Sequence, residues 1–107
     1  MIGATNLVVA MRRLDDIIAD LRRLRPSLSQ RYPIRGIGVF GSYVRGEQKP
    51  GSDLDVLVEL DGSVGLIEFV GLKQDLSDAM GIDVDLVAKD ALKPRIGRRI
   101  LAEVVMV

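Results

Sequence analysis

Residues 34–60, IRGIGVFGSYVRGEQKPGSDLDVLVEL, carry the clearest strand and turn signals of this chain. The first part of this stretch, Ile34–Phe40, is rich in β-branched residues and predicts a short strand. Gly41–Gly46 then predicts a turn with one turn of helix, and residues 47–52 have the Gly, Pro and Ser content of a loop. We therefore expect one strand to end at Gly41 and a second to begin soon after the loop.

The second strand is predicted over Asp53–Leu60. Its centre, Val56-Leu57-Val58, is apolar at consecutive positions, so both faces of the strand carry apolar side chains. Strands of this kind are covered on both faces, which indicates a central place in a sheet.

The segment before this stretch predicts an amphipathic helix from about Asn6 to Arg25. Asn6 has a side chain typical of a helix N-cap. Pro26 has no backbone N–H, so we expect the helix to end before it.

After residue 60, the pattern predicts a helix over Leu66–Met80, with Gly81 as its left-handed cap, and a third strand over Ile82–Val87. Pro94 suits the first turn of a last helix that runs to about Glu103. Val104–Val107 is apolar and is expected to pack or to form a short strand. These elements predict an α+β fold, a small mixed β-sheet with helices packed on it, in a single domain over residues 1–107.

Composition excludes several kinds of chemistry. The chain has no Cys and no His, so thiolate and imidazole catalysis, disulfides and Cys/His zinc sites are ruled out. Oxygen ligands remain, and these suit Mg²⁺ or Mn²⁺. The net charge is zero, which does not indicate direct nucleic-acid binding. No stretch is long enough to span a membrane, and we expect a cytoplasmic protein. The basic residues near both ends suit either solvated helix faces or a surface for an acidic partner.

Two pairs of acidic residues stand on predicted strands. Asp53 and Asp55 are two apart, so their carboxylates project from the same face, and Asp83 and Asp85 repeat the pattern. A lone pair of this kind is most often a solvated strand end. Two pairs on core strands indicate instead a site where a divalent cation offsets the repulsion between carboxylates. If the strands are neighbours, an acid of the second pair can join the first.

Gly41-Ser42 directly follows the first predicted strand. A glycine there lets backbone N–H groups approach a phosphate, and the Ser42 hydroxyl adds a donor. Arg45, one helical turn later, could reach the same anion. A Gly-Ser pair alone is usually only a turn.

Together these motifs resemble the nucleotidyltransferase superfamily of DNA polymerase β, whose signature is Gly-Ser at a strand end followed by Asp-x-Asp among apolar residues. Within it the chain looks like the minimal nucleotidyltransferase (MNT) group, the antitoxin half of HEPN–MNT toxin–antitoxin pairs. The resemblance covers nearly the whole chain and is carried by residues 38–42, 44–46, 52–58, 84–87, 92–94 and 99–103.

The resemblance implies a nucleotidyltransferase fold and an enzyme that moves AMP from ATP to an acceptor hydroxyl. By this resemblance Gly41, Ser42 and Arg45 hold the triphosphate, and Asp53 and Asp55 bind Mg²⁺. Asp85 is then the third metal-binding and catalytic carboxylate, and Asp83 has a structural or outer role.

The acceptor that the resemblance implies is a tyrosine of a HEPN-type toxin, with which the protein could form an oligomer. The sequence leaves two alternatives open: an antitoxin that neutralises its partner by binding alone, and transfer to a small molecule.

Overall fold

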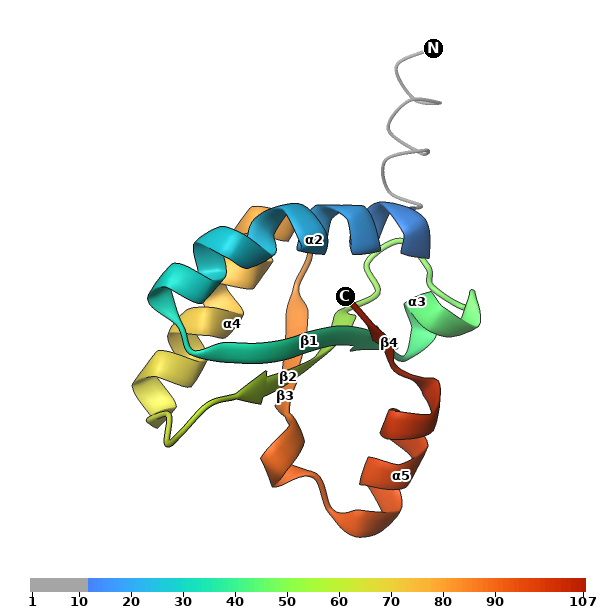
Figure 1. Cartoon of the computed structure of the whole chain (residues 1–107). Helices are drawn as coiled ribbons and strands as arrows, with labels where there is room; N and C mark the ends of the chain where they lie inside the picture. Colours follow the sequence, from blue (N-terminus) through green and yellow to red (C-terminus); the bar gives the residue numbers. More distant parts are fainter. Residues whose placement is uncertain (1–11) are drawn as a thin grey trace.

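A four-stranded mixed sheet organises residues 12–107, the part of the chain described by a computed structural model (Figure 1). In chain order the elements are α2 (Leu14–Arg31), β1 (Ile34–Phe40), α3 (Ser42–Arg45), β2 (Leu54–Leu60), α4 (Leu66–Met80), β3 (Val84–Ala88), the 3₁₀ helix η1 (Lys89–Ala91), α5 (Pro94–Glu103) and β4 (Val105–Met106). The predicted α+β fold is confirmed.

The strand order across the sheet is β3-β2-β1-β4. β1 runs antiparallel to β2 and to β4, whereas β2 and β3 are parallel and joined through α4. The predicted central position of β2 is confirmed, since it is hydrogen-bonded to a strand on each side. Its Val56, Leu57 and Val58 side chains are all buried.

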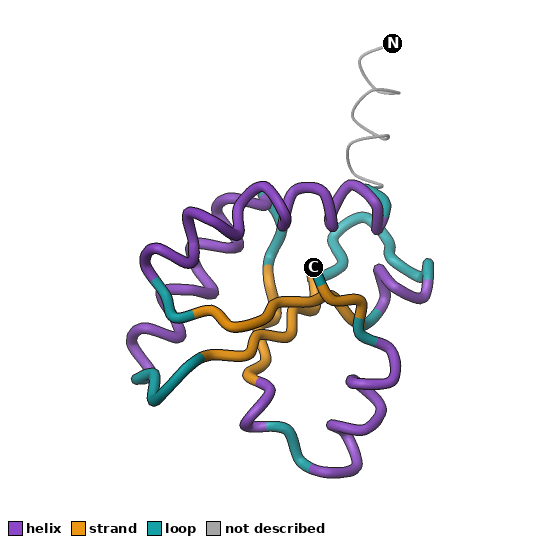
Figure 2. Tube along the Cα trace, in the orientation of Figure 1, coloured by secondary structure: helices purple, strands orange, loops and turns teal. Residues whose placement is uncertain are grey.

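Two helices, α2 and α4, pack together over one face of the sheet, and α5 lies on the other side (Figures 1 and 2). The buried core lies under α2 and α4. Its largest fully buried side chains are aliphatic, namely Ile17, Leu21, Leu28, Ile37, Leu54, Leu72, Leu76, Val39, Val56, Val58 and Val84. The sheet face toward α5 is thereby left to carry polar side chains at the strand ends.

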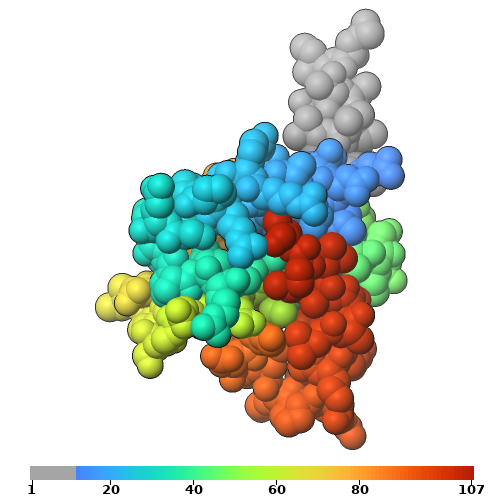
Figure 3. Space-filling model, viewed as in Figure 1, coloured from blue at the N-terminus to red at the C-terminus, as the bar shows by residue number. Residues whose placement is uncertain are grey.

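The C-terminal segment completes the sheet edge, as the sequence allowed. The N–H of Val107 donates to the carbonyl of Ile37 at 2.9 Å. The guanidinium of Arg25 donates to the Val107 carbonyl at 2.6 Å, which ties this end to α2. Figure 3 shows the C-terminal residues directly against α2.

The prediction that Pro26 ends the first helix is wrong. α2 continues through Pro26 to Arg31. A proline inside a helix removes one backbone hydrogen bond and costs about 3 kcal/mol. Here Leu21 and Leu28 lie two turns apart on the buried face, one on each side of the proline, and both are fully buried. Burial of this face offsets the lost bond.

The first helix also begins later than the sequence predicts, because Arg13 is its extended N-cap and α2 starts at Leu14. The remaining boundaries agree with the sequence to within two residues. α4 spans the predicted residues, and Gly81 is its left-handed cap with φ of 67°. β3 begins at Val84 rather than Ile82, because its pairing with β2 starts where Val84 lies opposite Leu54, the first residue of β2. Sequence patterns did not predict η1. The proposed Asn6 cap lies outside the described residues, and within residues 12–107 no helix is both long and apolar enough to span a membrane.

Candidate active site

The parallel pair β2 and β3 brings two of the predicted acids face to face. Asp55 and Asp85 are Cα partners in this pair. Neighbouring residues such as Leu54, Val56 and Val84 point into the core, so the two aspartates project from the opposite face, toward α5. Asp53 directly precedes β2.

Asp55 is held in an unfavourable place for a negative charge. Burial, followed by the charges of Asp85 and Asp53, raises the pKa of Asp55 to about 6, and the positive charge of Arg45 only partly opposes this. A carboxyl hydrogen bond between Asp55 and Asp85 raises it further. Asp55 therefore keeps its proton at mildly acidic pH, and a cation could take the place of that proton.

Asp83 lies farther from this pair. Its backbone carbonyl accepts a hydrogen bond from the N–H of Leu54 at 2.9 Å, which starts the β2–β3 pairing. Asp83 is not among the charges that shift Asp55, whereas Asp85 and Asp53 are. The geometry thus brings Asp85, and not Asp83, against Asp55.

The loop after β1 lies on the Asp55 carboxylate. Gly41 has φ of +81°, a conformation that L side chains rarely adopt. A Cβ atom at Gly41 would lie 1.9 Å from Asp55 Oδ2. Ser42 follows as the first residue of α3 and is half-buried. Glycine is therefore required at position 41 both by backbone conformation and by the acid behind it.

Arg45 is engaged by two acids. Its Nη1 donates to Glu103 Oε1 at 2.6 Å, and its Nε donates to Glu47 Oε1 at 2.8 Å. The second oxygen of Glu103, Oε2, accepts the Gly41 N–H at 2.8 Å. This backbone hydrogen bond is the main cause that lowers the pKa of Glu103. One carboxylate thus contacts both Gly41 and Arg45, two of the three residues that were predicted to hold an anion.

Glu103 was missed as a site residue at the sequence level. It stands some 60 residues after Gly41 and ends α5. The only sequence feature that pointed to Glu103 was its place in residues 99–103, one of the segments that resemble the minimal nucleotidyltransferase group. Which acid would reach Gly41 depends on how α5 packs across the sheet, and no local pattern encodes that.

Two hollows flank the aspartates. One, of about 320 Å³, lies under α5 and is lined by Phe40, Gly41, Arg45, Asp55, Ile96, Arg99, Ile100 and Glu103. The other, of about 530 Å³, lies toward α4 and is lined by Asp53, Lys73, Gln74, Ser77, Asp83, Val84 and Asp85. The first presents arginines and a glycine N–H, and the second presents the remaining acids with one lysine.

A model of the nucleotidyltransferase domain family matches residues 21–107. The chain belongs to the nucleotidyltransferase domain family. It is 43% identical over 99 residues to the protein adenylyltransferase MntA of Thermococcus cleftensis, a match that covers 92% of this chain and 100% of that protein. The family resemblance carried by the sequence motifs is confirmed.

Solved structures agree with this membership. A chain provisionally assigned as a minimal nucleotidyltransferase superposes with a TM-score of 0.73 and 31% identity, covering 88% of this chain and 95% of that one. A toxin–antitoxin crystal structure with AMP-PNP superposes with a TM-score of 0.64 and 28% identity, covering 86% of this chain and 69% of that one. The predicted nucleotidyltransferase fold is therefore confirmed.

The carboxylates of this nucleotidyltransferase suit a hard divalent cation. Within residues 12–107 no group of three acids is already close enough to form a metal cage. Mg²⁺, however, is usually held by one or two carboxylates together with waters and substrate phosphates. The contact between Asp55 and Asp85, with Asp53 adding its charge, fits that coordination chemistry.

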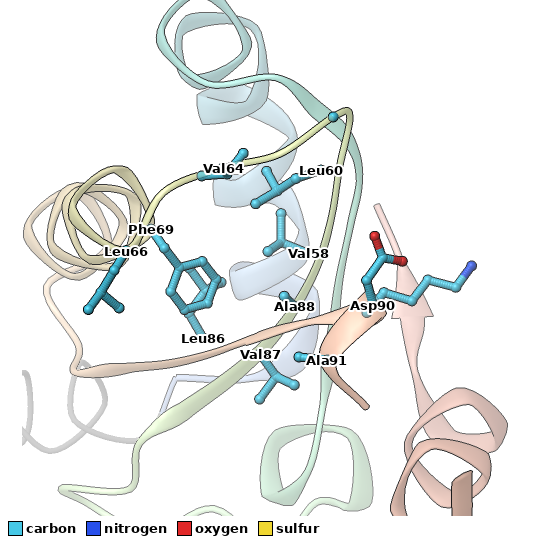
Figure 4. Close-up of a pocket in the computed structure, with 12 residues that line it drawn as sticks. Val58, Leu60, Val64, Leu66, Phe69, Leu86, Val87, Ala88, Asp90 and Ala91 are labelled. Carbon is cyan, nitrogen blue, oxygen red and sulfur yellow. The ribbon is translucent and has the colours of Figure 1, made fainter. Parts of the chain in front are cut away.

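A larger hollow, of about 660 Å³, lies elsewhere on the sheet (Figure 4). Figure 4 shows Phe69 of α4 and Val58 and Leu86 of the sheet turned toward it. Its walls are mainly apolar, and none of the aspartates at positions 53, 55 and 85 lines it. This hollow is therefore separate from the candidate active site.

Proposed function

We propose that this protein transfers AMP from ATP to a tyrosine hydroxyl of a HEPN-type toxin, and that it acts in this way as an antitoxin. The observation that carries the proposal is the Asp55–Asp85 carboxyl pair beside the Gly41 loop. Adenylyl transfer is supported by the similarity to an MntA adenylyltransferase, and a toxin partner by the similarity to a toxin–antitoxin structure with AMP-PNP.

In the proposed reaction, the acceptor hydroxyl oxygen attacks the α-phosphorus of ATP. A bond forms between that oxygen and phosphorus, the α–β phosphoanhydride bond breaks, and pyrophosphate leaves. Asp85 accepts the hydroxyl proton. Bound Mg²⁺, held by Asp53, Asp55 and Asp85, would stabilise the charge that develops on the phosphates.

The two hollows support a division of the site between donor and acceptor. The hollow under α5 presents Gly41, Arg45 and Arg99, which suit a triphosphate. The hollow toward α4 presents Asp85 with Lys73, which suits an approaching hydroxyl that has to lose its proton. The chain's own residues thus orient the two reactants on opposite sides of Asp55 and Asp85.

The test separates a catalyst from a protein that neutralises its partner by binding. A HEPN-type toxin is incubated with this protein at well below one equivalent, with and without ATP and Mg²⁺. Toxin mass and toxic activity are followed together. We expect a mass gain of one AMP or more, with loss of toxicity only when ATP is present.

Two variants sharpen this test. The double variant Asp53→Asn, Asp55→Asn should give no adduct and no protection, whereas Asp90→Asn, which changes an exposed acid on η1, should act like the wild type. Protection by the double variant at equal stoichiometry, with no adduct, would instead establish neutralisation by binding. A small-molecule adduct without toxin modification would establish the other alternative.

A further inference from the structure

The carboxylate of Glu103 occupies donors that a phosphate would need. Its two oxygens accept the Gly41 N–H at 2.8 Å and the Arg45 guanidinium at 2.6 Å. Only about 23% of the Glu103 side chain is exposed, so the contact is partly shielded from water. A carboxylate presents two negatively charged oxygens in nearly the way that a phosphate presents a pair of its own.

These donors cannot serve both anions at once. The Gly41 N–H has a single hydrogen to donate. The charge of Arg45 is already opposed by two acids, Glu47 and Glu103. A triphosphate that enters the hollow under α5 therefore meets an anion site that is filled by the chain itself.

We propose that Glu103 is an internal occupant of the anion site formed by Gly41 and Arg45, and that it has to leave before the triphosphate of ATP can bind there. Glu103 thereby sets the affinity for nucleotide. This inference rests on the proposed function, because it takes the Gly41 loop as the triphosphate site.

The fold offers a second position for the displaced carboxylate. Arg99 lies four residues before Glu103 on α5 and lines the same hollow. Residues four apart on a helix are neighbours on its surface, so a change of side-chain rotamer is enough to bring the two together. Glu103 is also the last residue of α5, and the chain is extended from Val104 onward. The exchange needs no movement of the sheet.

The test measures affinity, not turnover. Binding of ATP with Mg²⁺, and of tripolyphosphate without metal, is measured by titration calorimetry for the wild type, Glu103→Gln and Glu103→Ala. Loss of a charge-assisted hydrogen bond that competes with the ligand should lower the Kd on the order of tenfold. The gain should be larger for Ala, which has no acceptor for the Gly41 N–H.

Glu47→Gln is the matched control. It also removes an acid from Arg45, but the Glu47 side chain makes its hydrogen bond to Arg45 and not to Gly41. We expect a much smaller gain in affinity, and an equal gain would overturn the role given to the Gly41 contact. The Gly41 amide resonance should move in both Glu103 variants and, on addition of tripolyphosphate, in the wild type, which also shows that the variants are folded.

The outcomes separate this inference from the proposed function. If the wild type binds ATP and the Glu103 variants bind it equally or more weakly, Glu103 is a support of the loop and this inference alone is wrong. If neither the wild type nor the variants bind ATP or tripolyphosphate, the triphosphate site itself is wrong. Tighter binding by both variants supports the inference, even where adenylyl transfer is absent.

Discussion

Asp55 on β2 and Asp85 on β3 are direct partners across a parallel strand pair, and the charge of Asp85 helps to raise the pKa of Asp55. They lie far apart in the sequence, and the crossover through α4 brings them together. Each of the two ionised groups raises the cost of ionising the other. The hydrogen-bonded pairing of β2 with β3 fixes the separation of the two aspartates, so the repulsion is relieved by a proton or by a cation.

This relationship predicts an unusual pH dependence of stability in the absence of divalent metal. The pKa of Asp55 is raised from 3.8 to about 6 in the folded protein. Between these values the folded state binds more protons than the unfolded state, so this group makes the protein less stable as pH rises through that window. At neutral pH we therefore expect Asp55→Asn to unfold at a higher temperature than the wild type.

After allowance for solvent screening of this half-exposed group, the gain should be about 1 kcal/mol, or about 4–8 °C in Tm. The difference should disappear below the lower pKa, where Asp55 is protonated in both states. Asp90→Asn serves as the control and should show neither effect. A gap between Asp55→Asn and the wild type that stays constant over the whole pH range would contradict the assignment.

Much of the fold and of the candidate site could be predicted from the sequence, and the errors have identifiable physical causes. Ile34–Phe40 and Leu66–Met80 were placed at their observed bounds because apolar periodicity and a following glycine define both ends locally. Pro26 misled the prediction because its local cost is offset by tertiary burial of Leu28, which no window around the proline contains. Glu103 was missed for the same kind of reason, since its partners Gly41 and Arg45 lie about 60 residues earlier, in the loop after β1 and in α3.

Tyr43 shows the same limit on a smaller scale. It stands inside the Gly-Ser loop, where the sequence favours packing at the surface over stacking on a base. The structure buries its side chain in the hydrophobic core, which leaves only 5% exposed. Loop composition gives no sign of such burial, because the short helix α3 turns Tyr43 inward.

Divalent metal should stabilise the protein through the same carboxylates. A ligand that binds only the folded state stabilises it by mass action, by about 2.7 kcal/mol at one hundred times its Kd. We expect Tm to rise with added Mg²⁺, and with Mn²⁺, and to fall back on addition of EDTA.

The rise should vanish in the double variant Asp53→Asn, Asp55→Asn and persist in Asp90→Asn. Both variants lose acidic charge, but only the double variant loses it at the proposed metal site. The comparison therefore distinguishes metal binding at this site from general screening of acidic charge by Mg²⁺. An equal rise in the double variant would mean that the cation binds elsewhere.

Asp85 on β3 and Asp83, which directly precedes β3, should differ sharply in function. Asp85 faces Asp55, whereas Asp83 is tied to the start of β2 through its backbone. We expect Asp85→Asn to reduce adenylyl transfer by at least about a hundredfold, the scale of a lost general base. Asp83→Asn should change it by only a few fold.

Both variants should keep the wild-type fold and the wild-type affinity for the proposed HEPN-type partner, which circular dichroism and calorimetry check. Equal losses of transfer would show that the two acids share one site. A larger loss for Asp83→Asn would show that the family pattern had been carried onto the wrong acid.

Gly41 is expected to be the least replaceable glycine of the chain that the structure describes. Its φ of +81° is strained for any L residue, and a Cβ there would lie 1.9 Å from Asp55 Oδ2. Gly51 also has a positive φ, of +88°, but a Cβ there would meet no atom within 4 Å. Comparing substitutions at Gly41 and Gly51 therefore separates the cost of backbone strain from the cost of the clash with Asp55.

We expect Gly51→Ala to cost about 1 kcal/mol of unfolding free energy, the backbone term alone. Gly41→Ala should cost about 2–4 kcal/mol, because Asp55 or the loop has to move as well. A double-mutant cycle, read by urea unfolding, isolates the second term: in an Asp55→Ala background the cost of Gly41→Ala should fall toward that of Gly51→Ala. If the cost of Gly41→Ala is the same in both backgrounds, the loop does not rest on the Asp55 carboxylate, and the contact that links the anion loop to the carboxyl pair is absent in solution.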